Sequence, residues 1–114
     1  MEQFVHRVGL NRRRIKRMND LDILFQFKTN PKIFWKERNG VKNNTVRRID
    51  LSDDRFTHLI AWFEIGWNDG DILIEIVNTE DSDSFIREIR DITVWDDLMI
   101  ITWNPHKKYD KGER

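Results

Sequence analysis

Alternating apolar and polar positions predict a strand near the start of the chain and three more in its second half. Residues 21–27 (LDILFQF) carry an apolar side chain at every second position, which is the period of a strand with one buried face. Later runs rich in β-branched and apolar residues, separated by turn-forming residues, predict strands at 71–77, 84–95 and 98–103. These last three follow one another closely enough to pair in succession.

Two segments carry the start and stop signals of helices. Asn30 can cap a helix, a proline follows at the first helical position, and Gly40 suits the left-handed residue after the last turn. A second helix, with Ser52 or Asp53 as its cap, has apolar residues at helical spacing and is predicted to end near Gly66.

The chain between these helices is predicted to be extended from Asn44. Thr45 and Arg47 then lie on one face of a strand, and Val46 and Arg48 on the other. The order of elements is strand, helix, strand, helix and three strands. This order predicts an α+β fold, a small and partly closed β-barrel of five or six strands with two short helices.

The length of 114 residues fits a single domain, and five Trp and seven Phe supply a core. We expect a basic N-terminal segment (1–20), a barrel domain (21–103) and a flexible C-terminal tail (104–114). Cysteine is absent, which favours a reducing compartment. No apolar run approaches the ~18 residues that a membrane span needs. A cytoplasmic protein without a membrane partner is therefore expected.

Charge is distributed unevenly along the chain. Residues 1–48 hold 13 Lys and Arg against 4 Asp and Glu, whereas residues 49–114 hold 7 against 16. One interpretation is that the basic half binds a phosphate backbone; the other is that the two halves neutralise each other across the sheet. The densest candidates for backbone contacts are Arg12, Arg13, Arg14, Lys16 and Arg17.

One short motif resembles the ASCH family of the PUA-like superfamily. It is a helix ending in Gly-x-Lys-x-x-Thr-x-Arg, followed later by a Gly-Asp that leads into an apolar strand. The matching residues are Gly40, Lys42, Thr45 and Arg47, with Gly70 and Asp71 as the Gly-Asp. The resemblance covers residues 21–103 and implies a β-barrel that binds RNA or modified nucleotides beside this motif.

The resemblance also implies a possible enzymatic activity. One branch of the family hydrolyses the acetyl amide of acetylated cytidine, and the residues that match its catalytic pair are Lys42 and Thr45. In that branch a glutamate from a late helical insertion assists. No such insertion is predicted here, so no matching glutamate is assigned.

The residues themselves allow a ligand-binding and a structural interpretation. Lys42 can donate three hydrogen bonds to a phosphate or a carbonyl oxygen, and if partly buried it could lose its proton and activate the Thr45 hydroxyl. Arg47 shares the face of Thr45 and could bind a phosphate or a base edge. Alternatively, both cations are solvated and Thr45 is an ordinary strand residue.

Other candidate sites are weaker. Trp67, beside a glycine and a turn, is the tryptophan expected to line a cleft and stack on a base, while most of the other tryptophans are expected in the core. The histidines at positions 6, 58 and 106 lack ligand spacing, so no metal site and no cofactor are expected.

Three functions from different classes follow. The first is a module that binds nucleic acid, RNA in particular, or a modified nucleotide through Lys42, Thr45, Arg47 and Trp67. The second is a small amidohydrolase acting on acetylated cytidine. The third is a protein-binding adaptor of phage or prophage origin that docks its basic stretch on an acidic partner.

Overall fold

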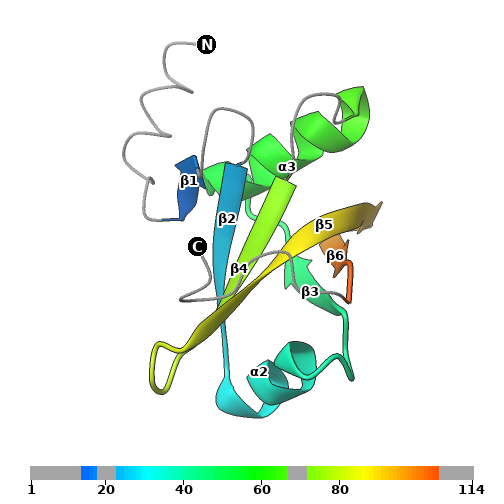
Figure 1. Cartoon of the computed structure of the whole chain (residues 1–114). Coiled ribbons are helices and arrows are strands. Elements are labelled where there is room, and N and C mark those ends of the chain that lie inside the picture. Colours follow the sequence, from blue (N-terminus) through cyan, green and yellow to red (C-terminus); the bar gives the residue numbers. More distant parts are fainter. Residues whose placement is uncertain (1–13, 18–22, 67–71, 106–114) are drawn as a thin grey trace.

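The computed structural model describes residues 14–17, 23–66 and 72–105, and these form an α+β fold (Figure 1). Its elements, in chain order, are β1 (Ile15–Arg17), β2 (Ile23–Thr29), α2 (Pro31–Arg38), β3 (Asn44–Arg48), α3 (Asp54–Ile65), β4 (Ile72–Asn78), β5 (Ser84–Trp95) and β6 (Leu98–Trp103). Every helix and strand predicted from the sequence is confirmed, with ends displaced by no more than two residues. The α+β class is confirmed as well.

β1 was not predicted. It lies inside the stretch expected to be a basic N-terminal segment, yet it pairs with β2 through Ile15–Arg17 and Ile23–Phe25. A strand of three residues with one apolar side chain has no periodic pattern, so only its neighbour in the fold reveals it. Of the expected N-terminal segment, only residues 14–17 are described. Residues 106–114 of the expected tail also lie outside the described residues.

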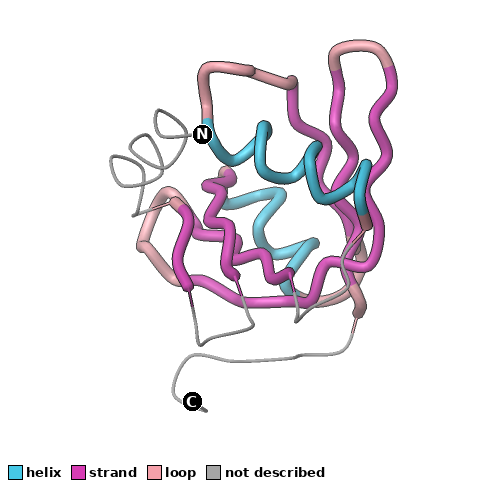
Figure 2. The backbone as a smooth tube through the Cα atoms, turned by 90° about the horizontal axis from the view of Figure 1, so that it is seen from above, coloured by secondary structure: helices cyan, strands magenta, loops and turns pink. Residues whose placement is uncertain are grey.

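The described strands form one curved sheet in the order β1-β2-β4-β5-β6-β3. β2 and β4 are parallel, and α2, β3 and α3 form the crossover between them; the other pairs are antiparallel. Figure 1 shows α3 at one end of the curved sheet and α2 at the other, and Figure 2 shows the strands curving around the helices when seen from above. β1 and β3 are the two edges, so the sheet is not closed by strand pairing.

Both helices begin and end where local chemistry predicts. The Asn30 side chain accepts a hydrogen bond from Ile33 N at 3.0 Å, and Gly40 has a φ of 81° just after α2. Asp53, one of the two proposed caps, accepts from Arg55 N at 3.0 Å and starts α3. Among the described residues, no helix is long and apolar enough to cross a membrane.

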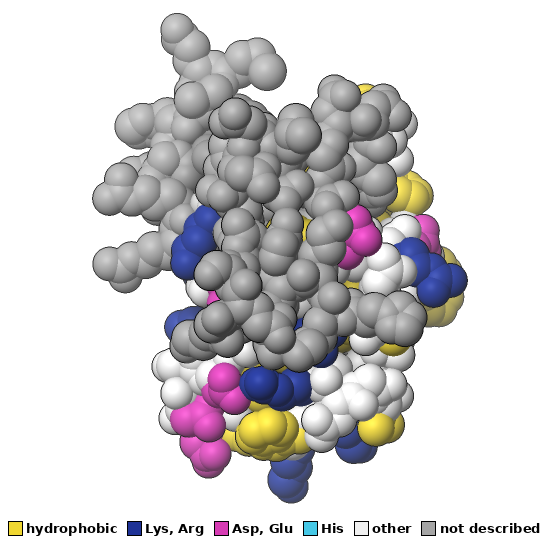
Figure 3. Space-filling model, in the orientation of Figure 1, with side chains coloured by type: hydrophobic (Ala, Val, Ile, Leu, Met, Phe, Trp, Pro, Cys, Tyr) yellow, Lys and Arg dark blue, Asp and Glu magenta, His cyan; other side chains and the backbone are white. Residues whose placement is uncertain are grey.

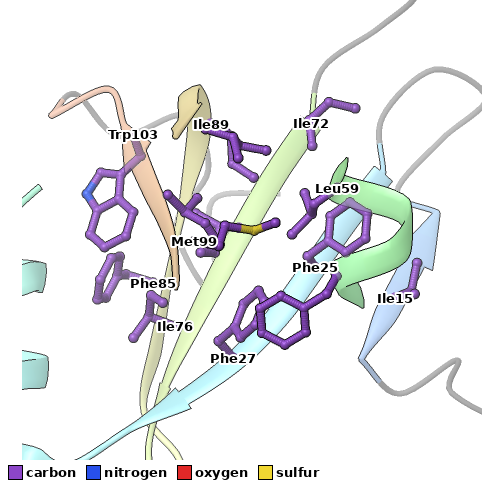
Figure 4. Packing of buried hydrophobic residues seen from close by; sticks show 14 of the residues in the cluster. Ile15, Phe25, Phe27, Leu59, Ile72, Ile76, Phe85, Ile89, Met99 and Trp103 are labelled. Carbon is purple, nitrogen blue, oxygen red and sulfur yellow. The ribbon is translucent and has the colours of Figure 1, made fainter. Parts of the chain in front are cut away.

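The core lies between the concave face of the sheet and the two helices. Phe25 and Phe27 of β2, Phe34 of α2 and Leu59 of α3 are almost wholly buried. Figure 4 shows these packed side chains extending from Ile15 to Trp103 across the fold. The core therefore holds both helices to one sheet.

The tryptophans divide between core and surface. Trp103 is fully buried and Trp62 packs against the core, as predicted, but Trp35 and Trp95 are 45% and 70% exposed. The prediction that most tryptophans are core residues was wrong for these two. Trp35 is an exposed residue of the short helix α2 and Trp95 lies at the end of β5, where no second layer of the described residues covers them.

Candidate functional site

The two ends of the sheet approach each other along a gap between β2 and β3. β1 pairs only with the first part of β2, up to Phe25. Beyond it, the Gln26 carbonyl accepts a hydrogen bond from Arg55 Nη1 at 2.7 Å, and the Lys28 carbonyl accepts one from Arg47 Nη1 at 2.9 Å. We call this gap, between residues 26–29 and 44–48, the seam. At the seam, arginine side chains donate hydrogen bonds to backbone carbonyls of a strand edge, which a further strand would otherwise bond.

Arg47 crosses the seam and is held on three sides. Its Nε donates to Thr45 Oγ1 at 2.9 Å, its Nη1 bonds the Lys28 carbonyl, and its Cζ lies 5.2 Å from the ring centroid of Phe27. The pKa of Arg47 is lowered, chiefly by burial. The charge of Glu37 acts to raise this pKa and the charge of Arg55 acts to lower it. An arginine nevertheless keeps its charge at neutral pH. Within the described residues, Arg47 forms no ion pair with a carboxylate.

Two further arginines share one carboxylate beside the seam. Asp53 Oδ2 lies 3.1 Å from Arg14 Nη1 and 2.5 Å from Arg55 Nη2. Burial acts to raise the pKa of Asp53, but the hydrogen bonds from Arg55 and the charges of both arginines outweigh it, so that pKa is lowered. Asp53 is therefore ionised at neutral pH and balances part of the charge of these two arginines.

A hollow of about 500 Å³ opens between these groups, and we call it the arginine hollow. Its lining residues are Arg14, Gln26, Lys28, Arg47 and Arg55. Four cations thus face one cavity, while the single charge of Asp53 is shared between two of them, Arg14 and Arg55. Lys28 and Arg47 are the two lining cations without a carboxylate partner among the described residues, and they also line the hollow next to α2.

A second hollow, of about 420 Å³, adjoins the first, and we call it the threonine hollow. It shares Lys28 and Arg47 with the arginine hollow. It adds the residues Thr29, Asn30, Ile33, Lys42, Thr45 and Val46. The shared wall is therefore cationic, and the rest of the threonine hollow combines hydrogen-bonding and apolar side chains.

Lys42 is fixed beside a buried glutamate that the sequence did not reveal. Its Nζ lies 3.0 Å from Oε2 of Glu37, whose side chain is 0% exposed, and it donates to the Asn44 carbonyl at 2.5 Å. Burial raises the pKa of Glu37, although the hydrogen bond and charge of Lys42 and the charge of Arg47 lower it. One signal was present: Glu37 follows the buried Phe34 by three residues and so shares its helix face.

Charges over the described part of the protein are largely interspersed. Three ion pairs join the basic half of the chain to the acidic half: Arg14 with Asp53, Arg38 with Asp83, and Arg48 with Asp97. Figure 3 shows Lys and Arg mixed with acidic and apolar side chains over the coloured part of one face. The basic and acidic halves of the chain therefore neutralise each other in part. Lys28 and Arg47, at the seam, are a local exception among the described residues.

The structure brings the three residues of the motif together, since Lys42, Thr45 and Arg47 all line the threonine hollow. Of the basic N-terminal candidates, Arg14 lines the arginine hollow, whereas Lys16 is exposed on β1 and lines neither hollow. The other proposed residues, Arg12, Arg13, Trp67 and the side chain of Arg17, lie outside the described residues, as do Gly70 and Asp71.

Several lining residues were missed from the sequence, and three of them matter most for the chemistry. Lys28 lies one residue before the end of β2, Asn30 was assigned only a capping role, and Arg55 lies in the first turn of α3. They come from separate elements, so no spacing along the chain relates them to the motif.

Comparison of the chain with protein-family models, curated proteins and solved structures finds no match in any of the three. The two hollows therefore carry the functional argument. What they offer is a fixed guanidinium, an exposed ammonium and a set of neutral donors in adjoining cavities.

Proposed function

We propose that this protein binds nucleic acid, RNA in particular, or a modified nucleotide, with its phosphates in the arginine hollow. The observation that carries the proposal is the shared wall, where Lys28 and Arg47 stand without carboxylate partners among the described residues. Phosphate is a group that clustered Lys and Arg side chains bind well. The ASCH resemblance, with the PUA-like barrel it implies, supports the same function as part of this proposal.

Arg47 suits phosphate binding because its geometry is fixed in advance. Nε and Nη1 are bonded to Thr45 and Lys28, while Nη2 has no hydrogen bond within the described residues. A guanidinium held in this way loses little side-chain entropy when it binds. Lys28 adds an exposed ammonium on an intrinsically flexible side chain beside it. The pair combines one rigid donor with one adaptable charge.

The proposal is tested by measuring the binding of a fluorescent single-stranded RNA by anisotropy at several salt concentrations. We expect Lys28→Gln and Arg47→Gln each to weaken binding by about tenfold. Each should also reduce the slope of log K against log salt concentration by about 0.7, the value for one phosphate contact on a single strand. Matched controls are Arg90→Gln and Lys32→Gln, at exposed residues that line neither hollow.

Lys42 needs a double variant, because its removal alone leaves the buried Glu37 carboxylate without its partner. Glu37→Gln combined with Lys42→Gln removes both charges and keeps the number of heavy atoms in each side chain. Thermal unfolding of each variant shows whether it is folded. RNA affinity unchanged in Lys28→Gln, Arg47→Gln and the folded double variant would overturn the proposal, and a protein partner would then be sought.

A second candidate, the amidohydrolase, is favoured by one observation. Lys42 and Thr45 line the same hollow, and Lys42 has the buried carboxyl group of Glu37 beside it. It ranks second because Lys42 Nζ already donates to both Glu37 and the Asn44 carbonyl, and neither bond joins it to the Thr45 hydroxyl. Acetate release from acetylated cytidine, followed by proton NMR at high protein concentration, tests this activity. No release would exclude it for this substrate.

A further inference from the structure

The threonine hollow presents an excess of hydrogen-bond donors. Lys42 uses two of its three N–H groups on Glu37 and Asn44, which leaves one. Thr45 Oγ1 accepts from Arg47, so its own hydrogen is available to donate. Asn30 Oδ1 caps α2, while its Nδ2 group has no hydrogen bond within the described residues. Three neutral or cationic donors thus face one cavity without a matching acceptor among them.

Apart from Thr29, the remaining lining residues of this hollow are apolar. Ile33 and Val46, which are 37% and 50% exposed, line it on the α2 and β3 sides. A ligand group that fits must therefore be partly apolar and rich in acceptors. A nucleobase with ring carbonyls has both properties, whereas a phosphate alone has no apolar surface. The volume of about 420 Å³ is within the ~300–1,000 Å³ of ordinary small-molecule sites.

We infer that the two hollows are the two halves of one nucleotide site, in which Lys28 and Arg47 hold the phosphate and the threonine hollow receives an acceptor-bearing base. The inference rests on the proposed function and makes it specific: one nucleotide unit is recognised, not only a charged backbone. Arg47 lines both hollows and therefore lies where phosphate and nucleoside meet. Uracil, with two carbonyl oxygens, is the simplest base that suits the donors.

The test is calorimetric titration of the full chain with uridine 5′-monophosphate, ribose 5-phosphate, uridine and inorganic phosphate. We expect the mononucleotide to bind about tenfold more tightly than each of the other three, because only it fills both hollows. Labelled protein should show NMR shifts at both Lys28 and Val46 with the mononucleotide. Ribose 5-phosphate or inorganic phosphate binding as tightly as the mononucleotide would overturn the inference.

Two variants separate the halves of the site. Asn30→Ser keeps a capping oxygen and adds no charge, but it removes the amide donor. It should weaken binding of the mononucleotide by about threefold and leave binding of inorganic phosphate unchanged, whereas Lys28→Gln should weaken binding of both. Equal effects of Asn30→Ser on both probes would contradict the two-part site.

The RNA and mononucleotide results also distinguish the two proposals. RNA binding without preference for the mononucleotide over inorganic phosphate leaves the proposed function standing and overturns the inference. Tight mononucleotide binding without RNA binding supports the inference and identifies a free nucleotide as ligand. Failure of both overturns both.

Discussion

At the scale of single residues, the contact between Glu37 and Lys42 is the least expected feature of the site. A carboxyl group without solvent exposure normally requires full hydrogen bonding, yet only Oε2 of Glu37 is bonded within the described residues. Burial and the ion pair act on Glu37 in opposite directions, and burial prevails. The protonation state of Glu37 therefore affects both the stability of the fold and the charge beside the threonine hollow.

The raised pKa of Glu37 predicts a pH dependence with a definite sign. A carboxyl whose pKa rises on folding binds its proton more tightly in the folded state, so its contribution to the free energy of unfolding is largest below its ordinary pKa of 4.5 and falls as the pH increases through the folded pKa. We expect the difference in that free energy, wild type minus Glu37→Gln, to decrease over this range. Urea unfolding at a series of pH values measures it.

The control for this experiment is Glu64→Gln, at an exposed position of α3. Its difference from wild type should lack the decrease seen with Glu37. If the difference for Glu37→Gln increased with pH, the ion pair with Lys42 would outweigh burial, and the direction given for the Glu37 pKa would be wrong.

At the scale of elements, sequence reasoning succeeded wherever a signal is local. The cap at Asn30 and the left-handed Gly40 place α2 within one residue of its observed ends, because both depend on neighbours a few positions away. The seam shows the opposite case. Lys28, Arg47 and Arg55 belong to three different elements, and only the order of strands in the sheet brings them together.

Gly40 provides a test of how firmly α2 is terminated beside the motif. Its φ of 81° disfavours a side chain, yet a Cβ at this position would meet no atom within 4 Å. Gly40→Ala should therefore lower the free energy of unfolding by about 1 kcal/mol through backbone strain alone. Gly40→Asn should cost less, because asparagine tolerates the left-handed region. Chemical denaturation of the three proteins measures this order, and an equal cost for both would argue against strain as the cause.

At the scale of the whole molecule, the sequence predicted the class and the succession of elements but not how the sheet ends. The periodic strands and capped helices are local patterns, so the α+β class followed from them. Whether β3 comes close to β2 depends on the curvature of the whole sheet, which no local sequence pattern determines. The sequence motif grouped Lys42, Thr45 and Arg47 because they are close along the chain. Lys28 joins them only through the folded sheet, so the sequence could not add it.

The shared core predicts unequal effects for two aromatic residues. Phe34 is 0% exposed and joins α2 to Phe85 of the sheet, at 5.4 Å between ring centroids. Phe34→Ala should lower the free energy of unfolding by about 3–5 kcal/mol, as expected for a buried phenylalanine. Trp95→Ala, at a residue 70% exposed, should change it by no more than about 0.5 kcal/mol. Denaturant unfolding compares them, and similar losses would mean that Trp95 is covered in solution.

The parallel pairing of β2 with β4 has a kinetic consequence. Ile23 aligns with Ile72, so the central pair of the sheet forms only after a long loop has closed. β4, β5 and β6 follow one another as antiparallel neighbours and can form early from local contacts. β2 then joins one side of this early unit and β3 the other. We therefore expect the seam, which needs both β2 and β3, to be among the last parts of the molecule to assemble during folding.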